Sequence, residues 1–342
     1  MSMNERERFR LLFRGEQVDR PPLLEEGVRD EVISLWHAQG LPEGRTHLDV
    51  FCLTPHENIG PDLTYDSDCA GRIMNMTPRE YRRAFHASRK RFPDDWRQTA
   101  RRLANRGHIA CIWAYRGFFQ ALGVEDWPTL RQVLYAVVRN PGGVRDRLEM
   151  YGDFCARMLG MALSDVQPEF IYLSEPISDN RGPLISPAAY QEFAIPALKK
   201  IIAAARGKSC GQILVSTYGN SARLFPMMLE AGANMLWISE APEVPELDYR
   251  NLRRALGPDV GLIGGIPLSL LRSADPESIG AQVKEIVAPL LRAGRYIPLA
   301  GGRIREDIPW HIYRRYRDCL HRFMRIKHGD SHHISRADRE SG

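Results

Sequence analysis

The chain has 342 residues, of which 44% are hydrophobic and 26% are charged, and its formal net charge is +5. These are ordinary values for a globular protein, and no apolar run approaches the roughly 20 residues that cross a bilayer, which excludes fibrous, disordered and transmembrane proteins. The first ten residues lack the apolar stretch of a signal peptide, and the six cysteines show no CxxC spacing. We therefore expect a cytoplasmic protein with reduced thiols.

Arginine dominates the basic residues, because only six of the 47 are Lys. Arg suits bidentate binding of carboxylate or phosphate, but most of these side chains are expected on solvated helix faces. The basic clusters alternate with acidic and apolar residues and form no continuous stripe with interleaved aromatics. We expect a small-molecule ligand, and neither a nucleic acid nor a membrane as a partner.

The first part of the chain, residues 1–105, is irregular and indicates a helical extension with long loops. Two early strands are expected there, at Pro22–Glu25 and Leu48–Leu53. From about residue 105 to about 325, short strands rich in Ile, Leu and Val alternate with segments of helical period. These later strands are expected at His108–Tyr115, Glu169–Glu175, Gln212–Tyr218, Asn234–Glu240, Val260–Ile266 and Tyr296–Ala300.

Two helices between these strands have recognisable ends. One begins at Pro187 after Ser186 and runs to Arg206, since Pro is favoured in the first helical turn. Another begins at Asn220 or Ser221 and ends where Gly232 provides the C-terminal stop.

A strand-helix repeat with about eight strands favours a closed (β/α)8 TIM barrel with an N-terminal helical extension. The periodicity alone also permits an open, doubly wound sheet. We expect one domain over residues 1–326 and a disordered tail over residues 327–342.

Residues at the C-terminal ends of the strands build the active site of a parallel barrel, so they are the candidates for chemistry. This rule selects Trp113, Tyr115, Arg116, Ser174, Glu175, Ser216, Tyr218, Asn220, Ser239, Glu240, Gly264, Gly265, Gly301, Gly302 and Arg303.

Two carboxylates, Glu175 and Glu240, directly follow apolar strands, and burial at a barrel mouth would raise the pKa of each toward that of a general acid. A salt bridge to one of the many Arg residues is the alternative for each. Tyr218 and Ser216 lie two residues apart on one strand, so their side chains point the same way, into the barrel. They are expected to hydrogen-bond a substrate or to cap the core.

Two of the predicted strands end at a pair of glycines. Gly264-Gly265 and Gly301-Gly302 permit either a close approach of the backbone to a ligand or a tight turn. Together with Arg303, the second pair is a candidate cradle for an anionic group. The chain has no GxGxxG, GxxxxGK[ST], HExxH or GxSxG motif and few His or Cys at strand ends, so no metal site is expected.

Several local patterns, taken in order, resemble the uroporphyrinogen decarboxylase superfamily, which includes cobalamin-dependent methyltransferases. The matching segments are Arg6–Phe9 with Gly15–Pro22, similar to an "RF...G...DR.P" signature, then Gly182–Pro187 with Phe193 and Pro196, Leu229–Asn234, Leu262–Ile266 and Tyr296–Pro298. The resemblance covers nearly the whole chain. It implies a (β/α)8 barrel with a pocket at its C-terminal mouth.

The chain departs from this superfamily at its metal and substrate motifs. An "RQAGR" stretch, which binds substrate carboxylates in the decarboxylases, is replaced by Leu23–Arg29. The methyltransferase branch, which Trp36–Pro42 resembles, often binds zinc through "HxCG" where this chain has Ser216–Asn220. A related subgroup has acids at this turn and "DH" where Gly301-Gly302 stand. The resemblance therefore implies no zinc here, and Glu175, Glu240 and Tyr218 would act by protonation or hydrogen bonding.

Three functions are compatible with these patterns. The leading hypothesis is a corrinoid-dependent methyltransferase or demethylase that moves a methyl group from a small methylated substrate to cobalamin on a partner protein. The alternative is a decarboxylase or other lyase on a carboxylated substrate, such as a tetrapyrrole, with Arg116, Arg181 and Arg303 binding carboxylates. The third is a non-catalytic ligand-binding barrel. A corrinoid protein and a second copy of the chain are the candidate protein partners.

Overall fold

The computed structural model describes residues 3–54, 56–65, 69, 71–273, 275 and 277–324, so the tail expected at 327–342 lies outside the described residues. The N-terminal part of the chain, up to residue 105, contains α1 (Glu5–Arg14), α2 (Asp30–Ala38), α3 (His47–Phe51), β1 (His56–Asn58), η2 (Ile73–Asn75), α4 (Pro78–Ala84), η3 (Arg89–Arg91) and α5 (Trp96–Asn105). The remainder contains β2 (Ile109–Tyr115), α6 (Phe118–Ala121), α7 (Trp127–Arg139), α8 (Pro141–Leu163), β3 (Phe170–Glu175), α9 (Pro187–Arg206), β4 (Ile213–Tyr218), η4 (Ala222–Leu224), α10 (Phe225–Glu230), β5 (Met235–Ser239), η5 (Pro245–Leu247), α11 (Tyr249–Leu256), β6 (Gly261–Ile266), α12 (Leu268–Ser273), α13 (Ile279–Ala293), β7 (Tyr296–Ala300) and α14 (Trp310–Phe323).

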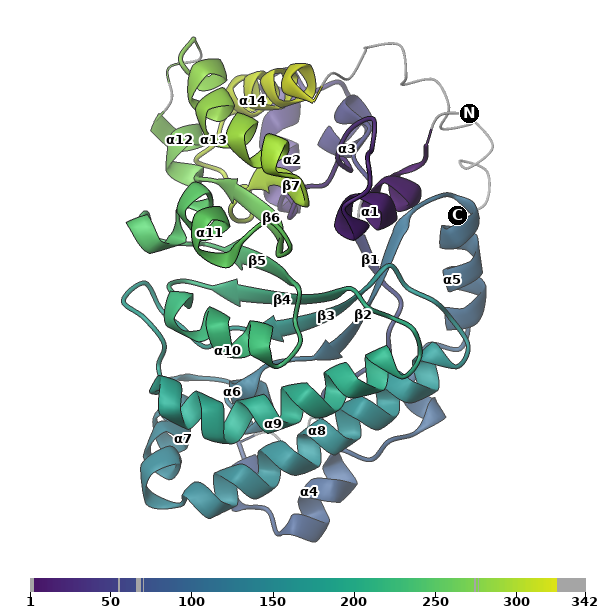
Figure 1. Cartoon of the computed structure of the whole chain (residues 1–342), viewed down its shortest axis with the longest axis vertical. Coiled ribbons are helices and arrows are strands. Elements are labelled where there is room, and N and C mark those ends of the chain that lie inside the picture. Colours follow the sequence, from purple (N-terminus) through teal and green to yellow (C-terminus); the bar gives the residue numbers. More distant parts are fainter. Residues whose placement is uncertain are drawn as a thin grey trace.

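The described strands form one curled, parallel, seven-stranded sheet in the order β1 to β7. Helices cover its outer surface, and Figure 1 shows α8 and α9 side by side across one part of it. The predicted strands from β2 to β7 are confirmed to within one residue at each end. Helix α9 begins after an N-cap at Ser186, as predicted, because the Ser186 side chain accepts a hydrogen bond from the Ala189 backbone N–H.

The two early strand predictions are wrong. Leu48–Leu53 overlaps helix α3, which begins with a capping box between Thr46 and Asp49. Pro22–Glu25 forms no strand, because Pro21 and Pro22 have no backbone N–H to donate to a ladder. The observed sheet therefore has seven hydrogen-bonded strands and is a partial barrel, where a closed eight-stranded barrel was predicted.

The segment 21–28 nevertheless passes between the two edges of the sheet. On the β1 side, the Thr54 N–H donates to the Leu23 carbonyl at 2.9 Å. On the β7 side, the Ile304 N–H donates to the Gly27 carbonyl at 3.1 Å, and Val28 forms a single parallel bridge with Ile304. The extended segment thus occupies the place of an eighth strand without its ladder of hydrogen bonds.

Helix α1 fills the end of the barrel where the strands begin (Figure 1). Its Phe9, Leu12 and Phe13 belong to the same buried cluster as the inward residues of the strands, and Phe9 stacks on Phe170 with ring centroids 5.2 Å apart. Gly261 of β6 leaves room for the Phe13 ring, since a Cβ there would lie 2.6 Å from a ring carbon. Helix α1 thus fills the interior at the N-terminal ends of the strands, which leaves their C-terminal ends as the side on which to look for a ligand site.

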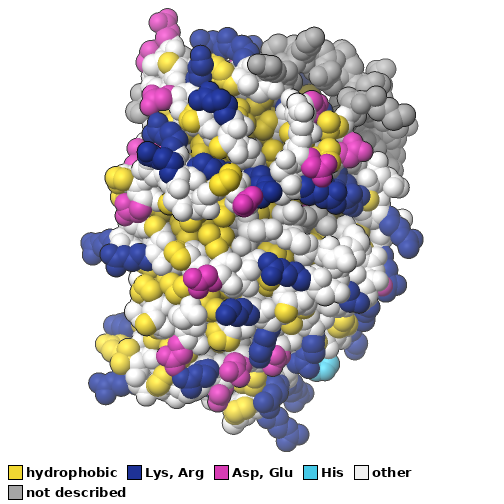
Figure 2. Space-filling view, viewed as in Figure 1, with side chains coloured by type: hydrophobic (Ala, Val, Ile, Leu, Met, Phe, Trp, Pro, Cys, Tyr) yellow, Lys and Arg dark blue, Asp and Glu magenta, His cyan; other side chains and the backbone are white. Residues whose placement is uncertain are grey.

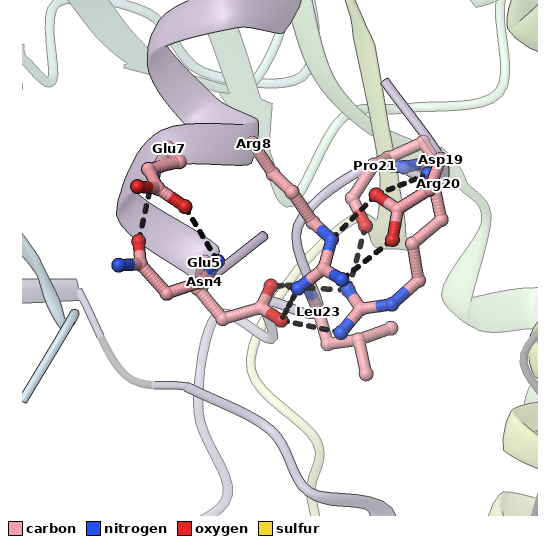
Figure 3. A network of polar contacts seen from close by, with 8 residues as sticks. All are labelled: Asn4, Glu5, Glu7, Arg8, Asp19, Arg20, Pro21 and Leu23. Atoms are coloured by element: carbon pink, nitrogen blue, oxygen red, sulfur yellow. Dashed lines mark hydrogen bonds and ion pairs between the residues drawn. The ribbon is translucent and has the colours of Figure 1, made fainter. Parts of the chain in front are cut away.

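A network of charges joins α1 to the segment 21–28 (Figure 3). The Glu5 carboxylate accepts hydrogen bonds from the Leu23 backbone N–H at 2.9 Å and from the guanidinium groups of Arg8 and Arg20. Arg8 also pairs with Asp19 at 2.6 Å. Arg8, Asp19 and Arg20 belong to the N-terminal signature, and their contacts with one another and with Glu5 fix the start of the segment that continues to Glu25 and Glu26.

Two further observations concern the surface. On the face drawn in Figure 2, Lys and Arg side chains are scattered among acidic and apolar ones, in agreement with the alternating pattern of the sequence. No helix within the described ranges is long and apolar enough to span a membrane.

Candidate active site

The alternation of side chains along each strand decides which candidates face the barrel interior. Phe170, Tyr172, Leu214 and Trp237 belong to the interior cluster. Residues two or four positions after an interior residue on the same strand therefore also point into the barrel, nearer to the C-terminal mouth. These later residues are Trp113, Ser174, Ser216, Tyr218 and Ser239. The predicted inward orientation of Ser216 and Tyr218 agrees with this alternation of side chains.

The central acid of the mouth is Glu26, which lies on the extended segment between the sheet edges. The Ser239 hydroxyl donates a hydrogen bond to Glu26 Oε1, whereas Glu26 Oε2 is buried and has no hydrogen-bond partner among the described residues. The pKa of Glu26 is raised from 4.5 to about 7, chiefly by burial and also by the neighbouring charges of Glu25 and Glu240, while the Ser239 hydrogen bond and the charge of Arg303 oppose the rise. A carboxyl group with this pKa can hold a proton near neutral pH and release it to a ligand.

Tyr218 shares this electrostatic environment. Burial raises the pKa of its phenol, as do the charges of Glu26 and Glu240, whereas the charges of Arg303 and Arg116 lower it. The phenol therefore stays protonated at neutral pH and can donate a hydrogen bond. Glu26, Tyr218 and Arg303 come from three separate parts of the chain and lie close enough for their charges to influence one another.

Glu240 is also at the mouth, but it is an ion-paired residue. Its Oε1 accepts a hydrogen bond from Arg305 Nη2 at 2.9 Å, which matches the salt bridge considered for it. Its backbone φ is +50°, a left-handed conformation that is strained for a residue with a side chain. A Cβ at Gly302 would lie 3.1 Å from the Glu240 carboxyl, so the predicted glycine pair gives this side chain its space.

Aromatic rings form one wall of the interior. The Trp113 and Tyr172 rings stack with centroids 4.9 Å apart, and the His56 ring lies 6.5 Å from Tyr172 and 5.1 Å from Trp237. Burial lowers the pKa of His56 to about 4, so its imidazole is neutral at pH 7. The Trp237 Nε1–H is buried without a hydrogen-bond partner among the described residues.

Two cavities flank this cluster. One of about 900 Å³ lies beside the ends of β1 and β2 and is lined in part by Asn58, Trp113 and Arg116. The other, of about 520 Å³, lies between the loops after β5, β6 and β7 and is lined in part by Glu240, Gly265 and Gly301. The Tyr249 hydroxyl bridges β5 and β6 beside this second cavity, because it accepts from the Ile238 N–H at 3.1 Å and donates to the Ile263 carbonyl at 2.7 Å.

Other predicted candidates lie outside the mouth cluster. Glu175 is fully buried on the opposite face of β3, where its carboxylate accepts hydrogen bonds from the Phe118 N–H at 2.9 Å and the Tyr190 hydroxyl at 3.2 Å. Burial raises its pKa to about 7. Tyr115 likewise faces outward, with its ring 5.7 Å from that of Tyr151.

Two more candidates belong to loops. The Asn220 side chain accepts a hydrogen bond from the Ala222 N–H at 3.3 Å and donates one to Glu246 at 3.4 Å. Arg181 is exposed, and its backbone N–H donates to Asp179 at 2.7 Å.

Sequence reasoning missed Glu26 and His56 as residues of the site. The signal for Glu26 was present, because it directly follows the segment expected as the first strand, so the strand-end rule would have selected it. His56 lies on β1, a strand that the sequence did not predict. Within the described ranges, no group of three or more His, Cys, Asp or Glu residues is placed to hold a metal ion.

The fold is a parallel α/β partial barrel with polar residues at the C-terminal ends of its strands, and comparison with known proteins gives its family. The sequence profile described as uroporphyrinogen decarboxylase (URO-D) matches residues 127–323, which is more than half of the chain. The chain therefore belongs to the uroporphyrinogen decarboxylase family. No curated protein matches it.

Solved structures with a related fold include a methyltransferase from Methanosarcina mazei, which is 14% identical. The match covers 94% of this chain and 99% of that chain, with a TM-score of 0.58. A putative vitamin-B12 independent methionine synthase from Listeria monocytogenes is 12% identical over 88% of this chain and 95% of that chain, but its TM-score is only 0.42. The likeness to the first structure supports a barrel-like α/β fold, and neither likeness identifies a substrate.

Proposed function

We propose that this protein transfers a methyl group from a small methylated substrate, held at the barrel mouth, to a corrinoid carried by a partner protein. The observation that carries the proposal is Glu26, a buried carboxyl group with a pKa of about 7 and one oxygen free of hydrogen bonds among the described residues. Demethylation of an ether or an amine needs such an acid, because the leaving oxygen or nitrogen must be protonated.

The chain's own residues would prepare the substrate for this reaction. A reduced corrinoid supplies the nucleophile that accepts the methyl group. As the bond between carbon and the heteroatom breaks, the heteroatom takes the proton of Glu26, and the carboxylate left on Glu26 faces the positive charge of Arg303. Tyr218 can hydrogen-bond the same heteroatom, and the aromatic wall of Trp113, Tyr172 and His56 excludes water from it.

Decarboxylation is the second candidate, because the positive charges of Arg116 and Arg303 both act on Tyr218 and so lie where a substrate carboxylate could bind. In this reaction the bond to carbon dioxide breaks, and the carbanion left behind takes the proton of Glu26. Both candidates use Glu26 as the acid, and they differ in the bond that breaks.

The proposal predicts the behaviour of Glu26→Gln in an anaerobic mixture of cob(I)alamin with pooled methyl ethers and methylamines. The wild-type protein should convert cob(I)alamin to methylcobalamin, followed by visible spectroscopy. Loss of the acid should slow the conversion about 100-fold or more. Glu16→Gln, which changes an exposed acid, is the control and should keep the wild-type rate.

The result against methyl transfer is no conversion while a known methyltransferase works in the same cuvette. Release of carbon dioxide from a porphyrinogen by the same preparation would then support the decarboxylase candidate. If Glu26→Gln converts cob(I)alamin to methylcobalamin at the wild-type rate, Glu26 is not the acid of the reaction.

A further inference from the structure

The cavity of about 900 Å³ beside β1 and β2 is strongly cationic, and we call it the cationic cavity. Its lining includes four permanent positive charges, from Arg83, Lys90, Arg91 and Arg116, and one carboxylate, from Asp62. The Asp62 carboxylate already accepts hydrogen bonds from the backbone N–H and the hydroxyl of Thr64, at 2.8 Å and 2.7 Å. The cavity therefore has an excess of three positive charges.

The cations of the cavity are not neutralised elsewhere in the described part of the chain. No described carboxylate lies within ion-pair distance of Arg83, Lys90, Arg91 or Arg116, whereas many other arginines, such as Arg97 and Arg250, have such a partner. Like charges around a shared cavity repel one another, and an anion placed between them relieves that repulsion.

Part of this charge is held rigidly in place. Arg91 donates hydrogen bonds to the carbonyls of His86, Thr64 and Ala84, at 2.9, 2.6 and 2.8 Å. Its guanidinium also lies 5.0 Å from the centroid of the Phe154 ring. These contacts leave Arg91 little freedom, so its positive charge is present before a ligand arrives and little entropy is lost on binding.

The cationic cavity adjoins the mouth cluster at Arg116 and Trp113. The Arg116 guanidinium lies 4.8 Å from the centroid of the Trp113 ring, and that ring stacks on Tyr172 inside the barrel. Both Arg116 and Trp113 also line the cavity. Arg116 is close enough to Tyr218 for its charge to act on that phenol. A ligand in the cavity that contacts Arg116 or Trp113 therefore lies beside the mouth cluster.

We infer that the cationic cavity binds the anionic end of the substrate, a carboxylate or phosphate group, while the reacting end lies at Glu26 and Tyr218. This inference rests on the proposed function for the position of the reacting end. It restricts the substrate class to small molecules that carry a negative charge at some distance from the reacting group. Arg83 and Lys90 are then specificity-determining residues, and Arg116 contacts both ends.

Calorimetric titration of the purified chain with propane-1,2,3-tricarboxylate and with pyrophosphate tests this inference and distinguishes carboxylate from phosphate. One of the two anions should bind with one-to-one stoichiometry. Arg83→Gln and Lys90→Gln should each weaken that binding about fivefold to tenfold, because each removes a charge-assisted contact. Arg82→Gln is the matched control, since Arg82 adjoins Arg83 on α4 but does not line the cavity, and it should change the affinity less than about twofold.

One further variant shows where the anion binds. Arg303→Gln at the mouth should leave its affinity nearly unchanged, and loss of binding only in that variant would move the anion to the mouth and overturn the inference. Binding of neither anion, or equal weakening by Arg82→Gln, would also overturn it. If Arg83→Gln or Lys90→Gln does not fold, Arg83→Lys and Lys90→Arg should still bind, because they keep the charge. The titration needs no turnover, so its failure is independent of the test for methyl transfer.

Discussion

Two adjacent acids, Glu25 and Glu26, have opposite surroundings because neighbouring side chains of an extended segment point to opposite sides. Glu25 is buried against α14, where its carboxylate accepts hydrogen bonds from Arg317 and the Tyr313 hydroxyl, each at 3.3 Å. Glu26 faces the mouth without a paired cation in hydrogen-bond contact. Glu25 is therefore a structural residue, and Glu26 is the acid available to a substrate.

The raised pKa of Glu26 predicts a pH-dependent effect of Glu26→Gln on stability. Between pH 4.5 and about 7 the folded protein keeps a proton on Glu26 that the unfolded chain releases, so wild-type stability falls as the pH rises through this range. Gln mimics the neutral acid and does not titrate. The variant should therefore match the wild type near pH 4.5 and exceed it by at most about 3 kcal/mol at pH 8, measured by urea unfolding. A difference that does not vary with pH would show that Glu26 titrates normally.

Glu175 offers a second residue-level test, because it was also predicted as an acid. The structure buries it completely on the outward face of β3. Glu175→Gln keeps an oxygen that can accept from the Phe118 N–H or the Tyr190 hydroxyl, so we expect methyl transfer within about tenfold of the wild type. Glu175→Ala leaves both donors unsatisfied and should cost about 2–4 kcal/mol in the free energy of unfolding. If Glu175→Gln abolishes turnover as completely as Glu26→Gln does, Glu175 is the catalytic acid and this prediction is wrong.

At the scale of elements, α1 and the segment 21–28 act together (Figure 3). Glu5→Gln removes the charge that pairs with Arg8 and Arg20, both of which are largely buried. We expect a loss of about 2–3 kcal/mol in the free energy of unfolding, together with slower turnover, because the anchored segment carries Glu26. Glu7→Gln on the same helix is the matched control, since Glu7 only completes the capping box with Asn4 and Gln can replace it there. Equal losses in the two variants would show that the network does not hold the segment.

Strand positions could be predicted from β2 onward because each strand is a short apolar run with Gly or Pro nearby, and α9 could be predicted from its Ser186-Pro187 start. The helix expected from Asn220 or Ser221 is instead a 3-10 turn, η4, followed by the short helix α10. The early strands could not, because the Thr46–Asp49 capping box turned an apolar run into α3, and two prolines removed the donors of a ladder at 22–25. The alternation of side chains along β3 would have shown that Glu175 points to the opposite face from Ser174 and Tyr172. The approach of Arg303 to Glu26 depends on tertiary packing and has no local signal in the sequence.

At the scale of the whole molecule, the barrel directs ligands to one end. Helix α1 fills the other end with Phe9, Leu12 and Phe13, and the mouth gathers an acid, a phenol and cations from distant parts of the chain. The family match at residues 127–323 does not include Glu26. The function proposed for this chain therefore depends on joining its N-terminal segment to the barrel of its family.

The central claim is that Glu26 holds a proton at neutral pH in the folded protein. Its most direct test is a carbon-13 NMR titration of the side-chain carboxyl groups in protein labelled at glutamate, with Glu26→Gln used to assign the resonance. We predict that the resonance missing from the variant titrates with a midpoint of about 7. A midpoint near the ordinary value of 4.5 would contradict the claim and leave the barrel mouth without its acid.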